Sequence, residues 1–191
     1  MRANLFGALA GLVLTGAALA DPAGPAAPLH PAPARLGIGQ PANPQDLAAW
    51  DIDVRADGQG LPQGHGSVRD GAALFGARCA ACHGARGEGA TADALVGGRG
   101  SLATAKPVRT VGSYWPYATT LFDYIRRAMP FDAPQSLSAD ETYALSAYIL
   151  NLNGILPDDS VLDAGTLPKV RMPNRDGFTP DVRPDVPIGA R

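Results

Sequence analysis

The prolines of this chain are unevenly distributed, and their positions confine regular structure to its middle. Of the 18 prolines, seven lie in Asp21–Pro44 and six in Pro157–Arg191. A proline fixes φ and removes a backbone donor, so segments rich in proline form extended arms rather than helices. The sequence therefore predicts an extended arm at 21–44, a folded domain at 45–156 and an extended tail at 157–191.

The first 20 residues have the pattern of a secretory signal peptide. Arg2 is their only charge, Leu5–Leu14 is apolar, and Ala18–Ala20 forms a small-residue cleavage site before Asp21. The apolar stretch is too short to span a bilayer comfortably, although an uncleaved membrane anchor is the alternative. No later stretch of the sequence is apolar for long enough to cross a membrane. We therefore expect an exported protein with no membrane span after cleavage.

Charge and cysteine content exclude several classes of protein. The chain has 16 basic and 18 acidic residues, a net charge of −2, whereas nucleic-acid-binding domains are usually strongly basic. Its two cysteines are too few for a disulfide framework or for a four-cysteine zinc site. The length of 191 residues suits one domain of about 100–150 residues with flanking segments.

The apolar pattern of residues 45–156 predicts an all-α domain, because strand-like alternation is limited to Ile52–Val54. The clearest helix begins at the capping box Ser138–Glu141 and ends at Asn153-Gly154, where glycine adopts the left-handed conformation at low cost. Three more helices are expected, from Pro44 to about Trp50, from Ser67 to about Ala81, and from Pro116 to Ala128.

Cys79, Cys82 and His83 form a Cys-x-x-Cys-His motif at the end of the second predicted helix. This spacing is the attachment signature of a c-type haem, whose vinyl groups bond to the two thiols and whose iron takes the imidazole as proximal ligand. A thioredoxin-like site usually accompanies a βαβ pattern, and a zinc site needs a second ligand pair. Neither feature is visible, and a disulfide or a chance match is the remaining alternative. We therefore expect one covalently bound haem c.

The iron of an electron carrier takes a second axial ligand, and a methionine thioether there raises the reduction potential. Met129 precedes Pro130, which stops the third predicted helix and leaves a loop that can fold over the haem. Met172 in the tail is the alternative ligand, and a buried structural role is the alternative for Met129. His30 and His65 lie in segments rich in glycine and proline and are expected at the surface.

Gly71, Phe75 and the Cys-x-x-Cys-His motif together resemble the first helix of class I cytochromes c. The resemblance implies a class I cytochrome c fold, in which the glycine lets the first and last helices cross closely. Tyr148 on the last helix matches the aromatic residue that packs beside this crossing. The physical reason is general, since a residue without a side chain permits close approach and two rings fill the rim.

Three further segments resemble the cytochrome c subunit of periplasmic Sox sulfane/sulfite dehydrogenases, namely Ala49–Val54, Gly112–Phe131 and Met172–Phe178. In that family the cytochrome accepts electrons from a separate molybdenum-cofactor subunit and delivers them to a downstream cytochrome or oxidase. The resemblance implies a periplasmic electron carrier with Met129 as axial ligand and no catalytic residues. The better-known subunit has a second cytochrome domain, whereas one haem motif here implies a single-haem form.

Two other functions remain open from the residues alone: a generic soluble shuttle for other dehydrogenases, and a haem sensor or peroxidase with a labile sixth ligand. Long segments without secondary structure are usually functional or disordered, and we expect the two arms to contact a partner subunit.

Several residues around the motif are candidates to support the haem. Arg99 and Arg109 are candidates to pair with the propionates, and Tyr114 and Trp115 to donate to them, with solvated or packing roles as alternatives. Many class I cytochromes have a Gly-Pro segment whose carbonyl binds the proximal imidazole, and this chain has no proline at 84–102. The glycine-rich stretch Leu95–Gly100 is the expected substitute.

Overall fold

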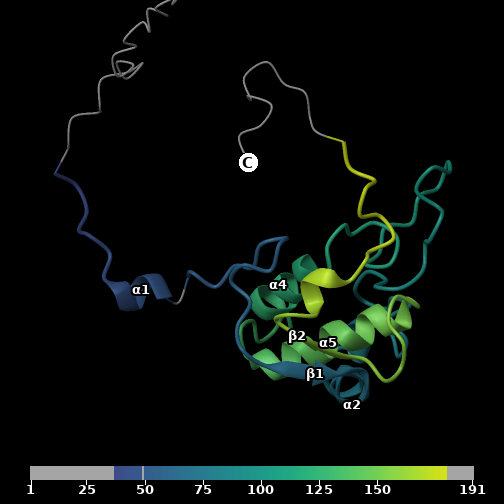
Figure 1. The fold of residues 1–191 in the computed structure, drawn as a ribbon, viewed down its shortest axis with the longest axis horizontal. Coiled ribbons are helices and arrows are strands. Elements are labelled where there is room, and N and C mark those ends of the chain that lie inside the picture. Colours follow the sequence, from purple (N-terminus) through teal and green to yellow (C-terminus); the bar gives the residue numbers. More distant parts are fainter. Residues whose placement is uncertain (1–36, 49, 180–191) are drawn as a thin grey trace, which may run out of the picture. The chain divides into compact units, whose positions relative to one another are not determined.

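The computed structural model describes residues 37–48 and 50–179, whose path is drawn in Figure 1. The expected signal peptide and most of the predicted arm at 21–44 lie outside the described residues. The described part contains five α-helices, two short strands and one 3₁₀ helix. In chain order these are α1 (Pro44–Ala48), β1 (His65–Ser67), α2 (Val68–Arg78), α3 (Ala80–His83), α4 (Ala118–Ala128), α5 (Ala139–Leu152), β2 (Val161–Asp163) and η1 (Leu167–Lys169).

Helices α1, α2 and α5 begin at the capping residues that the sequence predicted, whereas α4 begins at Ala118 rather than Pro116 and has no side-chain cap. The Ser67 hydroxyl oxygen accepts a hydrogen bond of 3.1 Å from the Asp70 N–H at the start of α2. At the start of α5 the Ser138 hydroxyl accepts from the Glu141 N–H at 3.2 Å, and the Glu141 carboxylate accepts from the Ser138 N–H at 2.8 Å. Helix α1 follows Asn43 in the same way. These bonds satisfy amide groups that a first helical turn leaves unpaired.

Helices α2 and α5 pack closely against each other, as the resemblance to class I cytochromes c implied. A Cβ atom on Gly71 would lie 1.9 Å from the Ala144 carbonyl oxygen and 2.7 Å from the Tyr148 Cβ. Only a residue without a side chain allows this approach. The Phe75 and Tyr148 rings pack beside the crossing with their centroids 5.4 Å apart.

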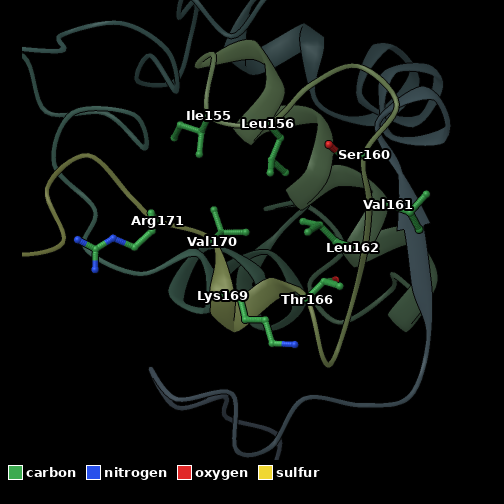
Figure 2. A pocket seen from close by; sticks show the side chains of 9 residues that line it. All are labelled: Ile155, Leu156, Ser160, Val161, Leu162, Thr166, Lys169, Val170 and Arg171. Carbon is green, nitrogen blue, oxygen red and sulfur yellow. The ribbon is translucent and has the colours of Figure 1, made fainter.

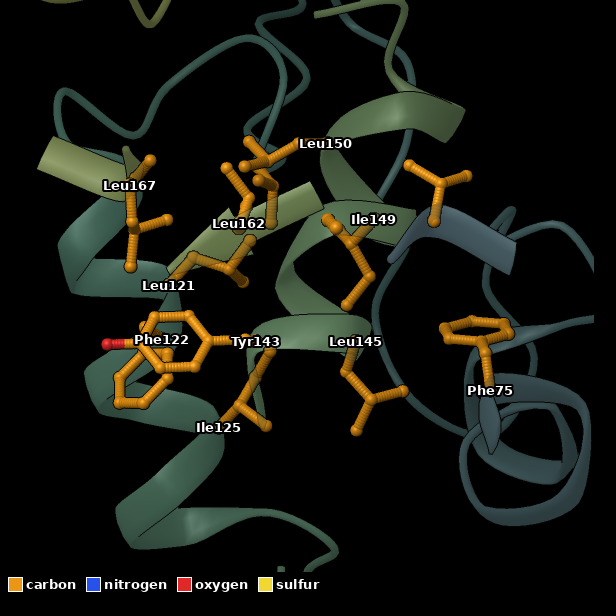
Figure 3. Packing of buried hydrophobic residues seen from close by; sticks show 14 of the residues in the cluster. Phe75, Leu121, Phe122, Ile125, Tyr143, Leu145, Ile149, Leu150, Leu162 and Leu167 are labelled. Atoms are coloured by element: carbon orange, nitrogen blue, oxygen red, sulfur yellow. The ribbon is translucent and has the colours of Figure 1, made fainter. Parts of the chain in front are cut away.

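The hydrophobic core lies between α4 and α5, and Figure 3 shows its side chains. Phe122 of α4 and Tyr143 of α5 are both completely buried, with ring centroids 4.5 Å apart. The Tyr143 hydroxyl donates a hydrogen bond of 2.9 Å to the Pro62 carbonyl, which ties the loop before β1 to the core. The remaining large aliphatic side chains from these two helices are Leu121, Ile125, Leu145, Ile149 and Leu150.

The segment after α5 differs from the extended tail that the prolines predicted. Strand β2 pairs antiparallel with β1, with His65 opposite Asp163, and η1 follows it. Leu162, Leu167 and Met172 are buried in the core. These residues recur every five positions, which matches neither the helical nor the strand period, so the sequence pattern predicts no regular element in this segment. The folded domain therefore continues beyond α5 at least as far as Met172.

The strand-like segment Ile52–Val54 has no regular secondary structure and pairs with no strand among the described residues. The Val54 N–H instead donates a hydrogen bond of 2.8 Å to the buried Asp123 carboxylate of α4. No helix in the described part of the chain is long and apolar enough to cross a membrane.

Candidate haem site

The Cys-x-x-Cys-His motif forms a separate helical turn rather than the end of α2. The single helix predicted from Ser67 to Ala81 is interrupted at Cys79, whose φ of −122° and ψ of −33° end α2. Its N–H still donates to the Phe75 carbonyl at 2.9 Å. Cys82 and His83 follow on α3, which stops at Gly84, where φ is +82°. Glycine suits this stop because other residues rarely adopt a positive φ.

The His83 imidazole is oriented by a backbone carbonyl. Its Nδ1 lies 2.9 Å from the Asp93 carbonyl oxygen, which accepts a hydrogen bond only from a protonated Nδ1. The bond therefore leaves the Nε2 lone pair available to a metal ion, which is the arrangement of metal-bound histidines. We expected this carbonyl within Leu95–Gly100, and the structure instead places it just before that stretch.

The loop after His83 folds back onto α3 and thereby positions the Asp93 carbonyl. The Gly89 N–H donates to the His83 carbonyl at 2.7 Å, and the Ala92 N–H donates to the Cys82 carbonyl at 2.9 Å. Gly89 has a φ of +94°, which the turn requires. These backbone bonds hold the residues just before Asp93 against α3 and so position its carbonyl for the imidazole.

The two thiols differ in their surroundings. Cys79 is half-buried and Cys82 is exposed, and neither forms a disulfide. Burial raises the pKa of the Cys79 thiol to about 11, with the nearby Arg78 charge acting in the opposite direction. Nowhere within the described ranges do three or more His, Cys, Asp or Glu side chains gather to hold a metal ion.

The structure distinguishes the two methionines that the sequence offered as axial ligands. Met129 ends α4, where its N–H donates to the Ile125 carbonyl at 3.0 Å, and its side chain is only half-buried against the core. Met172 is 3% exposed and belongs to the core itself. His65 is exposed on β1, as expected, and His30 lies outside the described residues.

A hollow of about 410 Å³ opens elsewhere on the domain, along the segment that follows α5 (Figure 2). Its lining contains none of the motif residues and does not include Met129. It is bordered by Ile155, Leu156, Ser160, Val161, Leu162, Thr166, Lys169, Val170 and Arg171.

Comparison with known proteins identifies the family to which this chain belongs. The family model described as cytochrome c matches residues 68–153, which run from the start of α2 to the end of α5. The crystal structure of the sulfane dehydrogenase SoxCD from Paracoccus pantotrophus contains a chain that is 43% identical and superposes with a TM-score of 0.72. The alignment covers 82% of this chain and 85% of that chain. The chain belongs to the cytochrome c family. A search of curated proteins gave no match.

The side chains of this cytochrome fit a covalently bound haem c. Cys79 and Cys82 would supply the two thiols, His83 has an Nε2 that its hydrogen bond leaves unused, and Met129 has a thioether that is only partly buried against the core. Half-buried apolar groups such as Leu95 and Trp115 also pack on the core without being covered by it. An apolar ring system would remove such surface from water, which is favourable by about 25 cal/mol per Å².

The other expected haem-supporting residues have protein partners in the structure. The Arg99 guanidinium donates to the Asn153 carbonyl at 3.3 Å. The Arg109 guanidinium lies 5.6 Å from the centre of the Tyr114 ring. Trp115 is half-buried and meets the Tyr124 ring edge-on, with centroids 5.8 Å apart. These contacts do not test whether the residues also bind the haem propionates, so those roles remain predictions.

Asn153 holds the loop that follows the motif, a role that sequence reasoning missed. It was expected only to stop α5, yet its side-chain amide donates to the Leu95 carbonyl at 3.1 Å and to the Ile149 carbonyl at 2.9 Å. A Cβ on Gly112 would lie 2.1 Å from its side-chain oxygen. The only feature of the sequence that drew attention to Asn153 was the Asn-Gly pair, which predicts the end of a helix.

Proposed function

We propose that this cytochrome is the electron-accepting subunit of a periplasmic, molybdenum-dependent sulfite or sulfane dehydrogenase. The observation that carries the proposal is the extent of the similarity to the sulfane dehydrogenase chain. The cytochrome c model ends at residue 153, whereas the 43% identical alignment covers 82% of the chain and so includes flanking segments. A generic electron shuttle needs only the haem domain, whereas a dedicated subunit also needs flanks that suit its partner.

Different residues of the chain would attach the cofactor and orient its histidine ligand. Cys79 and Cys82 would hold it through thioether bonds, and the Asp93 carbonyl keeps the His83 ring in one orientation and tautomer. Met129 would hold the iron together with His83, which would leave no position on it open to a substrate. When bound, haem c supplies one-electron redox chemistry, and the protein sets its potential through ligands and burial. No catalytic residue is required in this chain.

Spectroscopy of the holoprotein tests the axial ligand. The oxidised wild type should show the absorption band of methionine-ligated haem at the red end of the visible spectrum. Met129→Ala should abolish the band and lower the reduction potential, because a thioether favours the reduced iron. Met172→Leu is the matched control, since a volume-conserving core substitution usually costs less than about 1.5 kcal/mol. High-spin iron in the wild type at neutral pH would instead support a sensor or peroxidase.

Isolation from the native host tests the partner. The full-length protein with a C-terminal tag should co-purify in stoichiometric amount with a subunit that contains molybdenum, measured by elemental analysis. Addition of sulfite or a sulfane-sulfur compound to that complex should reduce the haem. A holoprotein that purifies alone and is reduced equally well by unrelated dehydrogenases would be a generic shuttle.

A further inference from the structure

Two segments outside the haem motif meet at the surface next to the start of α4. Tyr114 and Tyr117 lie in the loop that leads into α4, and Arg175 and Phe178 lie in the segment after Met172. The Asn174 side-chain amide joins the two segments by donating a hydrogen bond of 2.7 Å to the Tyr114 carbonyl. Neither segment contributes a proposed haem ligand.

Aromatic and guanidinium groups stack on one another where these segments meet. The Tyr114 and Phe178 rings pack edge-to-face with centroids 5.2 Å apart. The Arg109 guanidinium lies 5.6 Å from the centre of the Tyr114 ring, and that of Arg175 lies 4.3 Å from the centre of the Tyr117 ring. We call these five residues the Tyr114 patch. Phe178 is 50% exposed and Tyr114 is 36% exposed, so part of the patch faces solvent.

The segment that carries Arg175 and Phe178 is fixed by its own backbone. The buried Met172 anchors it, and the Arg175 N–H donates to the Met172 carbonyl at 3.1 Å. The Gly177 N–H donates to the Asn174 carbonyl at 3.1 Å, and a Cβ on Gly177 would lie 1.9 Å from the Asn174 side-chain oxygen. A surface ordered before binding loses little conformational entropy when a partner arrives.

The patch carries positive charge that the described part of the chain does not neutralise. The salt bridges in that part are Arg127–Asp123 and Arg171–Asp176, and neither involves Arg109 or Arg175. Residues 97–122 contain three basic residues and no acidic one. A guanidinium that stacks on a ring keeps the N–H groups at its edge free to bind a carboxylate through two parallel bonds.

We propose that the Tyr114 patch is the docking surface for the dehydrogenase subunit, and that this partner presents carboxylates to Arg109 and Arg175. The proposal rests on the proposed function and specifies the chemistry of the interface. Tyrosine, phenylalanine and arginine are the side chains enriched at protein interfaces, whereas lysine and glutamate are depleted there. Tyr114 and Phe178 supply apolar contact area, and the two arginines supply charge recognition and register.

Titration of holo-cytochrome variants with the purified molybdenum-containing subunit from the same host tests this proposal. Arg109→Gln combined with Arg175→Gln should weaken binding at least about tenfold and reduce its dependence on salt concentration. Phe178→Ala should also weaken binding by about tenfold, without changing the salt dependence. The matched control is Arg55→Gln combined with Arg69→Gln, which removes the same charge from exposed arginines outside the patch. The control should bind within about twofold of wild type at physiological salt.

Different results of this titration would overturn the docking proposal and the proposed function. Wild-type cytochrome that does not bind the molybdenum subunit would overturn both. Wild-type binding together with unchanged affinity of the double arginine variant would overturn the patch alone. The reduction potential of Phe178→Ala provides a second measurement, and we expect it to match wild type, because Phe178 is not among the residues expected to support the haem. In the double arginine variant, a shifted potential with unchanged affinity would place Arg109 at a haem propionate and overturn the docking role.

Discussion

Replacing Gly71 by alanine should destabilise the cytochrome, because the helix crossing leaves no room for a methyl group. The added Cβ would lie 1.9 Å from the Ala144 carbonyl oxygen and 2.6 Å from its carbon. Both neighbours are backbone atoms, which cannot rotate away, so α2 and α5 would have to separate. Gly76 lies on the same helix and provides the control, since nothing lies within 4 Å of a Cβ added there.

The magnitude follows from two opposing terms. Overpacking a well-packed contact costs about 1–3 kcal/mol, and the upper end applies at Gly71 because backbone must move. Alanine in place of glycine within a helix raises the free energy of unfolding by about 1 kcal/mol at either position. Gly71→Ala should therefore lower the free energy of unfolding by about 2 kcal/mol, whereas Gly76→Ala should raise it by about 1 kcal/mol.

Thermal unfolding of the holoproteins, followed by far-ultraviolet circular dichroism, measures the difference. For a domain of this size 1 kcal/mol corresponds to about 4 °C, so Tm should fall by about 8 °C for Gly71→Ala and rise by about 4 °C for Gly76→Ala. The haem absorption spectrum shows that each variant retains its cofactor. Equal stability of the two variants would refute the close crossing of α2 and α5 at Gly71.

Two further substitutions test the polar contacts of the domain. Asn153→Ala should cost about 1–2 kcal/mol in thermal unfolding because it leaves the Leu95 and Ile149 carbonyls unpaired, and an unchanged Tm would contradict its role in holding the loop. Tyr143→Phe should cost about 1 kcal/mol through the lost bond to the Pro62 carbonyl. Burial raises the pKa of Tyr143 to about 12, so its ionisation at high pH favours the unfolded chain. The difference in the free energy of unfolding between wild type and Tyr143→Phe should therefore shrink between pH 10 and 12. A stability difference between the two proteins that stays constant over this pH range would argue against burial of the phenol.

Features encoded by neighbouring residues were predictable from the sequence. The capping box at Ser138 and the Ser67 cap are complete within four positions, so their pattern located the starts of α5 and α2. Gly71 and Phe75 predicted the helix crossing because the resemblance to class I cytochromes c supplied a partner, Tyr148. The same resemblance gave the family, and the spacing of the Cys-x-x-Cys-His motif had already predicted the covalent haem.

Features that depend on distant backbone groups were not predictable. Any residue after His83 offers a carbonyl, so nothing in the sequence marks Asp93 as the acceptor. Strand β1 has only three residues and includes Gly66, which lacks the side chain that would signal a strand. A Cβ there would lie 2.1 Å from the Ala144 N, a requirement that only the packed structure reveals.

The pairing of β1 with β2 sets an order of events during synthesis. Strand β1 and the haem motif are made early, but β2 and the buried Leu167 are made only after α5. Contacts between distant parts of a chain form late because the intervening loop must first be closed. A chain that ended at α5 would therefore lack both the strand that pairs with β1 and part of its buried core.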